Sequence, residues 1–203
     1  MKTLVMSLFF ALVFAQPSLA NGLAEVQGIV DRNITIVIDY VKDKSIDKQV
    51  RNQKIIETVV PFFDFDFMAM VCLEKKHRKR LSKDQKKRFT ELFVKRLQES
   101  FLEKLDLYTD EEVVIESAKK VKKRIHVLTY LVSKGDKMDM NFKFKKTKKG
   151  WKVYDLEILG VSMVSTYRSQ FSGFLKTKSM DDLLAKLSET GSFGVPTGEK
   201  QKK

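Results

Sequence analysis

The chain has 203 residues and a formal net charge of +13, and 43% of its residues are apolar. This length is enough for one domain with a sizeable core after removal of a leader. The only cysteine, Cys72, excludes an intramolecular disulfide, so packing must hold the fold together. Because Cys72 lies in the apolar run FMAMVCL, we interpret it as a buried core residue and not as a reactive thiol.

Residues 1–20, MKTLVMSLFFALVFAQPSLA, have the pattern of a secretory signal peptide. Lys2 precedes an apolar run from Leu4 to Ala15, and the small residues Ser18 and Ala20 suit a signal peptidase. A bilayer span needs about twenty apolar residues, which argues against a membrane anchor. We therefore expect an exported, soluble protein whose working domain covers residues 21–189, followed by a disordered basic tail over 190–203.

The excess of positive charge has several interpretations. Export argues against nucleic acid as the partner. The lysines and arginines are spread along the chain, with local densities at 75–80 and 143–149. They can form a solvated polar face, or they can attract anionic lipid surfaces or acidic protein partners.

Helical spacing of apolar residues dominates the first half of the chain. We expect helices over residues 23–41 and 46–60, in the segment FFDFDFMAMVCLEKKHRK, and over 83–107. Ser45 is the expected N-cap of the second helix and Pro61 its stop. Asp64 or Asp66 is expected to cap the third helix, and Ser82 with Gln85 forms a capping box before the fourth.

After residue 108 the apolar period changes to two. The segments EEVVIES, VKKRIHVLTYLVS, KMDMNFKFKKT and GWKVYDLEIL predict four antiparallel strands joined by short turns. The third strand places four large apolar residues on one face: Met138, Met140, Phe142 and Phe144. In the fourth strand we expect Tyr154, Leu156 and Ile158 on one dry face, and Asp155 and Glu157 on the opposite, wet face.

Two more helices complete the expected fold. Gly160 ends the fourth strand, and Ser162 can cap a helix that continues to about Phe174. Ser179 can cap a last short helix. The fold class is therefore α+β, with helices packed on one face of an antiparallel meander of about four strands.

The sequence lacks the usual signatures of catalysis and of metal binding. His77 lies in a basic run and His126 in a strand, and neither has ligand partners at metal-binding spacing. Asp64 and Asp66 could be an acid–base pair, but their position before a helix suits capping better. We expect no enzyme activity, no metal and no cofactor.

One stretch resembles a known family. WKVYDLEILGVSMVSTYRSQF, residues 151–171, is similar to a signature of the MlaC family, also called toluene-tolerance or ABC-transporter auxiliary proteins. PFFDFDFMA, SKDQKKRFTELFVKRLQESF and KSMDDLLAKL are similar to further segments in the family's order. The resemblance implies a periplasmic phospholipid carrier that encloses acyl chains in a deep apolar pocket. It also implies two partners, an inner-membrane ABC transporter with an MCE-domain subunit and an outer-membrane lipoprotein complex.

On this hypothesis the pocket is lined by apolar and aromatic residues of the long helix, the third and fourth strands and the helix after them. The candidates are Phe93, Leu97, Met140, Phe142, Phe144, Tyr154, Leu156, Ile158, Val164, Tyr167 and Phe171. Tyr167 and Arg168 are candidates for the pocket mouth, where the guanidinium could meet a phosphate. For Arg168 a structural salt bridge is an equal alternative. Two other functions stay open: a cavity-bearing small-molecule binder or enzyme, and a solid-cored adaptor that only docks a transporter.

Overall fold

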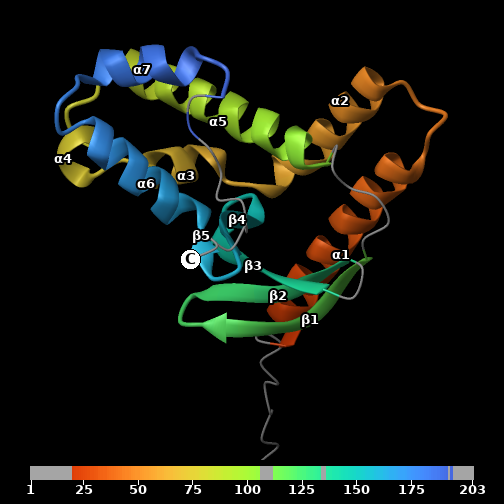
Figure 1. Ribbon diagram of the computed structural model, residues 1–203. Helices are drawn as coiled ribbons and strands as arrows, with labels where there is room; N and C mark the ends of the chain where they lie inside the picture. Colours follow the sequence, from red (N-terminus) through yellow and green to blue (C-terminus); the bar gives the residue numbers. More distant parts are fainter. Residues whose placement is uncertain (1–19, 106–111, 134–135, 192, 194–203) are drawn as a thin grey trace, which may run out of the picture.

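The computed structural model describes residues 20–105, 112–133, 136–191 and 193 (Figure 1). The helices are α1 Ala20–Lys42, α2 Lys48–Val59, the 3-10 turn η1 Val60–Phe62, α3 Phe65–Cys72, α4 Lys75–Arg78, α5 Lys83–Leu105, α6 Met163–Phe174 and α7 Met180–Ser188. The strands are β1 Glu112–Val121, β2 Arg124–Ser133, β3 Asp136–Thr147, β4 Gly150–Ile158 and β5 Val161–Ser162. The expected signal peptide up to residue 19, and residues 194–203 of the expected tail, lie outside the described residues.

The strands form one antiparallel sheet in the order β1-β2-β3-β4-β5, so the α+β class is confirmed. The two-residue strand β5 adds to the four strands expected. In Figure 1 the sheet lies below a layer that contains α3, α5, α6 and α7, and α1 runs beside the sheet. Within the described residues, no helix combines the length and the apolar character needed to cross a membrane.

Most helix starts follow the expected capping chemistry. Asp64 accepts the Phe67 amide at the start of α3, and Ser82 and Gln85 bond reciprocally before α5. The Ser162 and Ser179 caps are likewise confirmed. The expected Ser45 cap is wrong, because Asp47 caps α2 instead.

The apolar interior consists of two clusters. The helical core joins α3, α5, α6 and α7, and its fully buried side chains include Phe89, Phe93 and Phe171. The sheet core joins α1 and η1 to one face of the sheet, which we call the inner face. Its buried members are Val26, Val30, Phe62, Ile125, Val127, Phe142, Phe144 and Val153. Phe63 packs against both clusters and so connects them.

A β-bulge changes the side-chain pattern of β4. The register between β3 and β4 shifts between Lys143 and Phe144, so that Phe142 faces Leu156 whereas Phe144 faces Val153. A bulge places an extra residue in one strand and reverses the alternation beyond it. As a result Tyr154 leaves the inner face. Its ring instead meets the Phe67 ring at 6.1 Å and the Arg124 guanidinium at 4.0 Å. The expectation that Tyr154 shares a face with Leu156 and Ile158 is therefore wrong.

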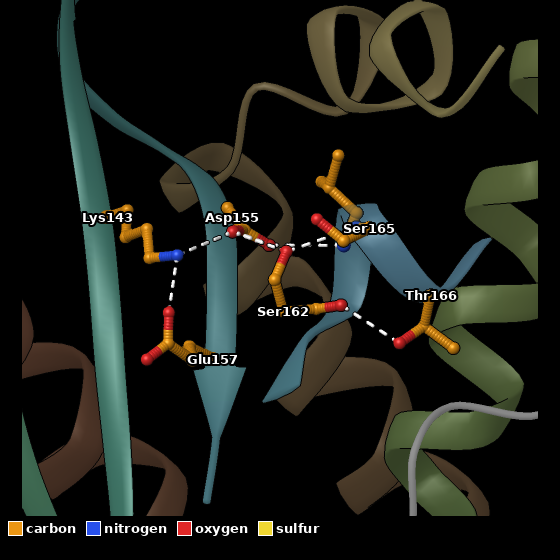
Figure 2. Close-up of polar contacts among 7 residues, drawn as sticks. Lys143, Asp155, Glu157, Ser162, Ser165 and Thr166 are labelled. Atoms are coloured by element: carbon orange, nitrogen blue, oxygen red, sulfur yellow. Dashed lines mark hydrogen bonds and ion pairs between the residues drawn. The ribbon is translucent and has the colours of Figure 1, made fainter. Parts of the chain in front are cut away.

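Asp155 is also not on a wet face, because it is only 5% exposed. Its carboxylate accepts hydrogen bonds from the Ser162 hydroxyl at 2.8 Å and the Val164 amide at 3.1 Å, and it pairs with the Lys143 ammonium at 3.1 Å (Figure 2). Lys143 also pairs with Glu157 at 2.6 Å. Asp155 thus ties β3, β4 and the first turn of α6 together.

The turn after β4 brings these groups into reach. Ile158 pairs with Val161, so Leu159 and Gly160 form a two-residue hairpin loop. Both have positive φ, 49° and 78°, as the tight hairpin turn that matches the strand twist requires. Ser162 therefore lies beside Glu157, with its hydroxyl directed to Asp155. The same hydroxyl accepts the Ser165 amide at 3.1 Å and caps α6.

We expect Asp155→Asn to lower the free energy of unfolding by about 2 kcal/mol. Ser162 and Lys143 donate to one carboxylate oxygen and the Val164 amide to the other. An Asn side chain would therefore set its NH₂ group against a donor in either orientation. Urea denaturation measures the change.

The matched control is Glu157→Gln, which removes only one ion pair of Lys143. This change should cost less than about 1 kcal/mol. Equal stability of Asp155→Asn and the parent protein would show that the buried carboxylate does not hold α6.

Candidate functional site

Five of the predicted pocket residues lie in the helical core: Phe93, Leu97, Val164, Tyr167 and Phe171. Their rings pack on one another. The Phe93 and Tyr167 centroids lie 5.3 Å apart, and those of Tyr167 and Phe171 lie 5.6 Å apart. Edge-to-face and tilted contacts at these distances are typical of a filled interior. These side chains therefore fill the space between α5 and α6.

Tyr167 lies in this interior and not at a surface, because its side chain is fully buried. Burial raises the pKa of its hydroxyl to about 12. The hydroxyl has no hydrogen-bond partner among the described residues. The structure therefore does not place Tyr167 at a pocket mouth.

Arg168 lies on the exposed side of α6, and its Nε donates to the Val71 carbonyl at 2.7 Å. This carbonyl belongs to the last turn of α3, where backbone acceptors lack helical partners. The contact braces α6 against α3. The observed acceptor is thus a backbone carbonyl, not the carboxylate of the salt bridge considered from the sequence.

The remaining inner-face candidates lie on β3 and β4. Phe142 and Phe144 are buried in the sheet core, and Met140 and Leu156 pack against it. Ile158 is the register partner of Met140, so it shares the same face. Met140, Leu156 and Ile158 are only half-buried, in contrast to the fully buried Phe144. The inner face is therefore closed near Phe144 and less covered toward Ile158.

Helices α1, α2 and α5 carry further half-buried apolar side chains that the pocket prediction did not include. They are Ile34, Val37, Ile38, Ile56, Val59, Phe101 and Leu102. Ile34 packs against the sheet core. A signal existed in the sequence, since Ile34 and Ile38 widen the apolar stripe of α1 beyond the width of one packed face. Phe101 and Leu102 likewise add bulk beside the apolar stripe of α5.

A surface groove of about 730 Å³ lies between α3 and α5. It is lined by Asp66, Met70, Lys86, Lys87, Thr90, Glu91, Val94, Lys95 and Gln98. None of the predicted pocket residues takes part. Three lysines and two carboxylates are among the lining residues, so charged groups border this groove.

The described residues also offer little for catalysis. No group of three or more possible metal-ligating side chains comes together in this part of the chain. Burial raises the pKa of the Cys72 thiol to about 12, so it is protonated and inert at neutral pH. Asp64 caps α3 and pairs with Lys145 at 2.8 Å, which supports the capping interpretation.

The end of the chain contributes to the helical core. The Phe193 ring meets the Phe171 ring at 5.1 Å, and the buried Arg96 donates from Nε to the Phe193 carbonyl at 2.8 Å. Arg96 also pairs with Glu99 at 3.4 Å. Phe193, which falls inside the segment expected to be a tail, thus packs on the helical core.

Comparison with known proteins gives one family and one closely shared fold. The family model described as MlaC protein matches residues 29–189. Among solved structures, the phospholipid-binding protein from Ralstonia solanacearum, in complex with a phospholipid, is similar with a TM-score of 0.70 and 20% sequence identity. The match covers 79% of this chain and 93% of that chain. At this identity the likeness establishes the fold alone.

No curated protein sequence matches the chain. The family model nevertheless spans most of the described residues, including most of both cores and the Asp155 junction. On this match, the chain belongs to the MlaC family.

Proposed function

We propose that this protein binds a phospholipid, with its acyl chains against the inner face of the sheet, and carries it without catalysis. The observation that carries the proposal is the incomplete cover of this face. Met140, Leu156 and Ile158 stay half-buried, whereas Phe144 and Val153 on the same face are fully buried. The shared fold with a phospholipid-binding protein that was solved with its ligand supports the same assignment.

The chemistry of this face suits acyl chains. Its exposed portion carries methionine and branched aliphatic side chains. Met140 is flexible, so its side chain can adapt to different chain shapes. Ile34 on α1 and Phe101 on α5 are also half-buried and could complete the wall of the lipid site.

The energetic requirement is large. Each acyl CH₂ left in water costs about 0.8 kcal/mol. Two chains of about fifteen carbons would therefore cost on the order of 24 kcal/mol if exposed. A carrier that moves through water must enclose both chains, and a site of this kind has a mostly apolar lining. The densely packed helical core would then serve as the rigid wall of the carrier.

The wider role follows from family membership and is part of the proposal. The carrier would work in the periplasm, after export directed by residues 1–20. It would pass lipid between an inner-membrane ABC transporter with an MCE-domain subunit and an outer-membrane lipoprotein complex. Phospholipid is the proposed ligand, and no cofactor or metal is needed for this task.

We expect organic extracts of gently purified protein to contain diacyl phospholipid close to one molecule per chain. Mass spectrometry of the extract measures it, with a protein of similar charge purified in parallel as the control. A lipid-free extract from a folded sample would favour the solid-cored adaptor. A different small molecule in the extract, or hydrolase activity of the sample, would favour the binder or enzyme.

Leu156→Arg should lose bound lipid, because it places a charge on the half-buried inner face. Ile158→Arg tests the same face nearer the uncovered end and is less coupled to the packed core. Lipid per folded protein is measured after circular dichroism has confirmed the fold.

Val114→Arg is the matched control, since Val114 is 40% exposed and its register partner Tyr130 pairs with Asp139, on the face opposite to Met140. This variant should retain lipid. If Leu156→Arg or Ile158→Arg is folded and still binds lipid at the parent level, the acyl chains do not lie on this face.

A further inference from the structure

Two β-hairpins bring an unusual density of cations to one end of the sheet. The β1–β2 hairpin contributes Lys119, Lys120, Lys122, Lys123 and Arg124, and the β3–β4 hairpin contributes Lys145, Lys146, Lys148, Lys149 and Lys152. We call these residues the basic end of the sheet. They are far apart in the sequence, and only the strand pairing brings them together.

The register places the two hairpin tips side by side. Arg124 pairs with Lys145 between β2 and β3, and Lys145 pairs with Lys152 between β3 and β4. Three cations therefore occupy one rung of the sheet. Neighbouring strands lie about 4.8 Å apart, so the centres of the two hairpins are about 10 Å apart. At this separation salt screens the repulsion between the tips only in part.

The carboxylates that contact this end offset little of its charge. Lys145 pairs with Asp64 at 2.8 Å, and Lys146 pairs with Glu25 at 3.6 Å. Within the described residues, six exposed lysines of the basic end have no ion pair: Lys119, Lys120, Lys122, Lys123, Lys148 and Lys149.

The neighbouring His126 responds to this charge. Burial lowers the pKa of its imidazole first, and the nearby Lys143 and Lys119 lower it further. Lys119 of the basic end thus contributes to the positive field at His126.

Apolar side chains accompany the cations. Val121, the last residue of β1, is 37% exposed and pairs with Arg124. Trp151 lies half-buried near the start of β4, with the Lys146 ammonium 5.2 Å from its ring centroid. Tryptophan is enriched at membrane–water interfaces, and lysine stems cover apolar surface while the ammonium stays in water.

We propose that the basic end of the sheet is a docking surface for an anionic phospholipid bilayer. Nine of its ten cations are lysines, and lysine is a hydrated point charge on a flexible stem. Such charges suit the diffuse field of lipid headgroups, whereas paired recognition of a protein carboxylate favours the arginine fork. Exposed lysines near an anionic membrane are attracted additively, within about a Debye length.

This inference goes beyond the proposed function, because it concerns how the protein meets a membrane surface and not what it carries. It needs no lipid at the inner face of the sheet. The two can therefore fail separately: vesicle binding can be lost while bound lipid is retained, and the reverse.

The test is co-sedimentation of the full protein with phosphatidylcholine vesicles, prepared with and without phosphatidylglycerol. We expect binding only to the vesicles with phosphatidylglycerol, and weaker binding at raised ionic strength. The variant Lys122→Gln, Lys123→Gln, Lys148→Gln, Lys149→Gln should bind about 600-fold more weakly, since each of the four cations near the surface contributes roughly fivefold.

The matched control removes the same charge from the helical layer, with Lys75→Gln, Lys79→Gln, Lys176→Gln and Lys178→Gln. These four lysines are exposed and lie on or beside α4 and between α6 and α7. The control should bind nearly as well as the parent protein. Equal losses in both variants would mean that net charge alone drives binding, which overturns the proposal. Absence of parent binding to the anionic vesicles would overturn it as well, and would favour an acidic protein as the partner of this end.

Discussion

The buried carboxylate of Asp155 is the interaction on which the arrangement of the two layers depends. It joins three segments: β3 through Lys143, the β5 residue Ser162, and the first turn of α6 through the Val164 amide. A carboxylate at a helix N-terminus is stabilised by the free amides and by the helix dipole. Its position on the strand therefore fixes where α6 begins relative to the sheet. From that start, Val164, Tyr167 and Phe171 reach the helical core.

This junction separates two kinds of interior. The helical core is filled by aromatic rings in mutual contact, and Phe193 with Arg96 adds cover from the end of the chain. The sheet core is closed around Phe144 and Val127 but leaves Met140 and Ile158 half-buried. On the proposed function, the first provides rigidity and the second receives the ligand. Ten of the 39 lysines and arginines of the chain lie elsewhere, at the hairpin tips.

Local patterns predicted the elements well, whereas long-range contacts decided the site. The caps at Asp64, Ser82, Ser162 and Ser179 were predictable, because capping depends on residues three positions apart. The face of the sheet on which Tyr154 lies was not predictable, since the bulge beside it depends on the pairing of β4 with β3. The alternation assumed for an unbroken strand also placed Asp155 on a solvent-exposed face of the sheet.

Two further residues illustrate the same limit. The place of Tyr167 and Arg168 on α6 could be derived from the sequence, but their partners could not. Tyr167 turned out to pack between α5 and α6, and Arg168 to bond the end of α3. The basic end of the sheet was equally hidden, because its two halves become neighbours only through the register of β2 and β3.

The most direct test of the proposed ligand position uses the methionines as reporters. Protein with ¹³C-labelled methionine methyl groups is loaded with a phospholipid that carries a nitroxide near the end of one acyl chain. Met138 and Met140 lie on the inner face, whereas Met68 is buried in the helical core and Met180 lies on α7. We predict strong broadening of the Met138 and Met140 methyl signals, with Met68 and Met180 sharp. Sharp Met138 and Met140 signals in protein with bound lipid would contradict the account.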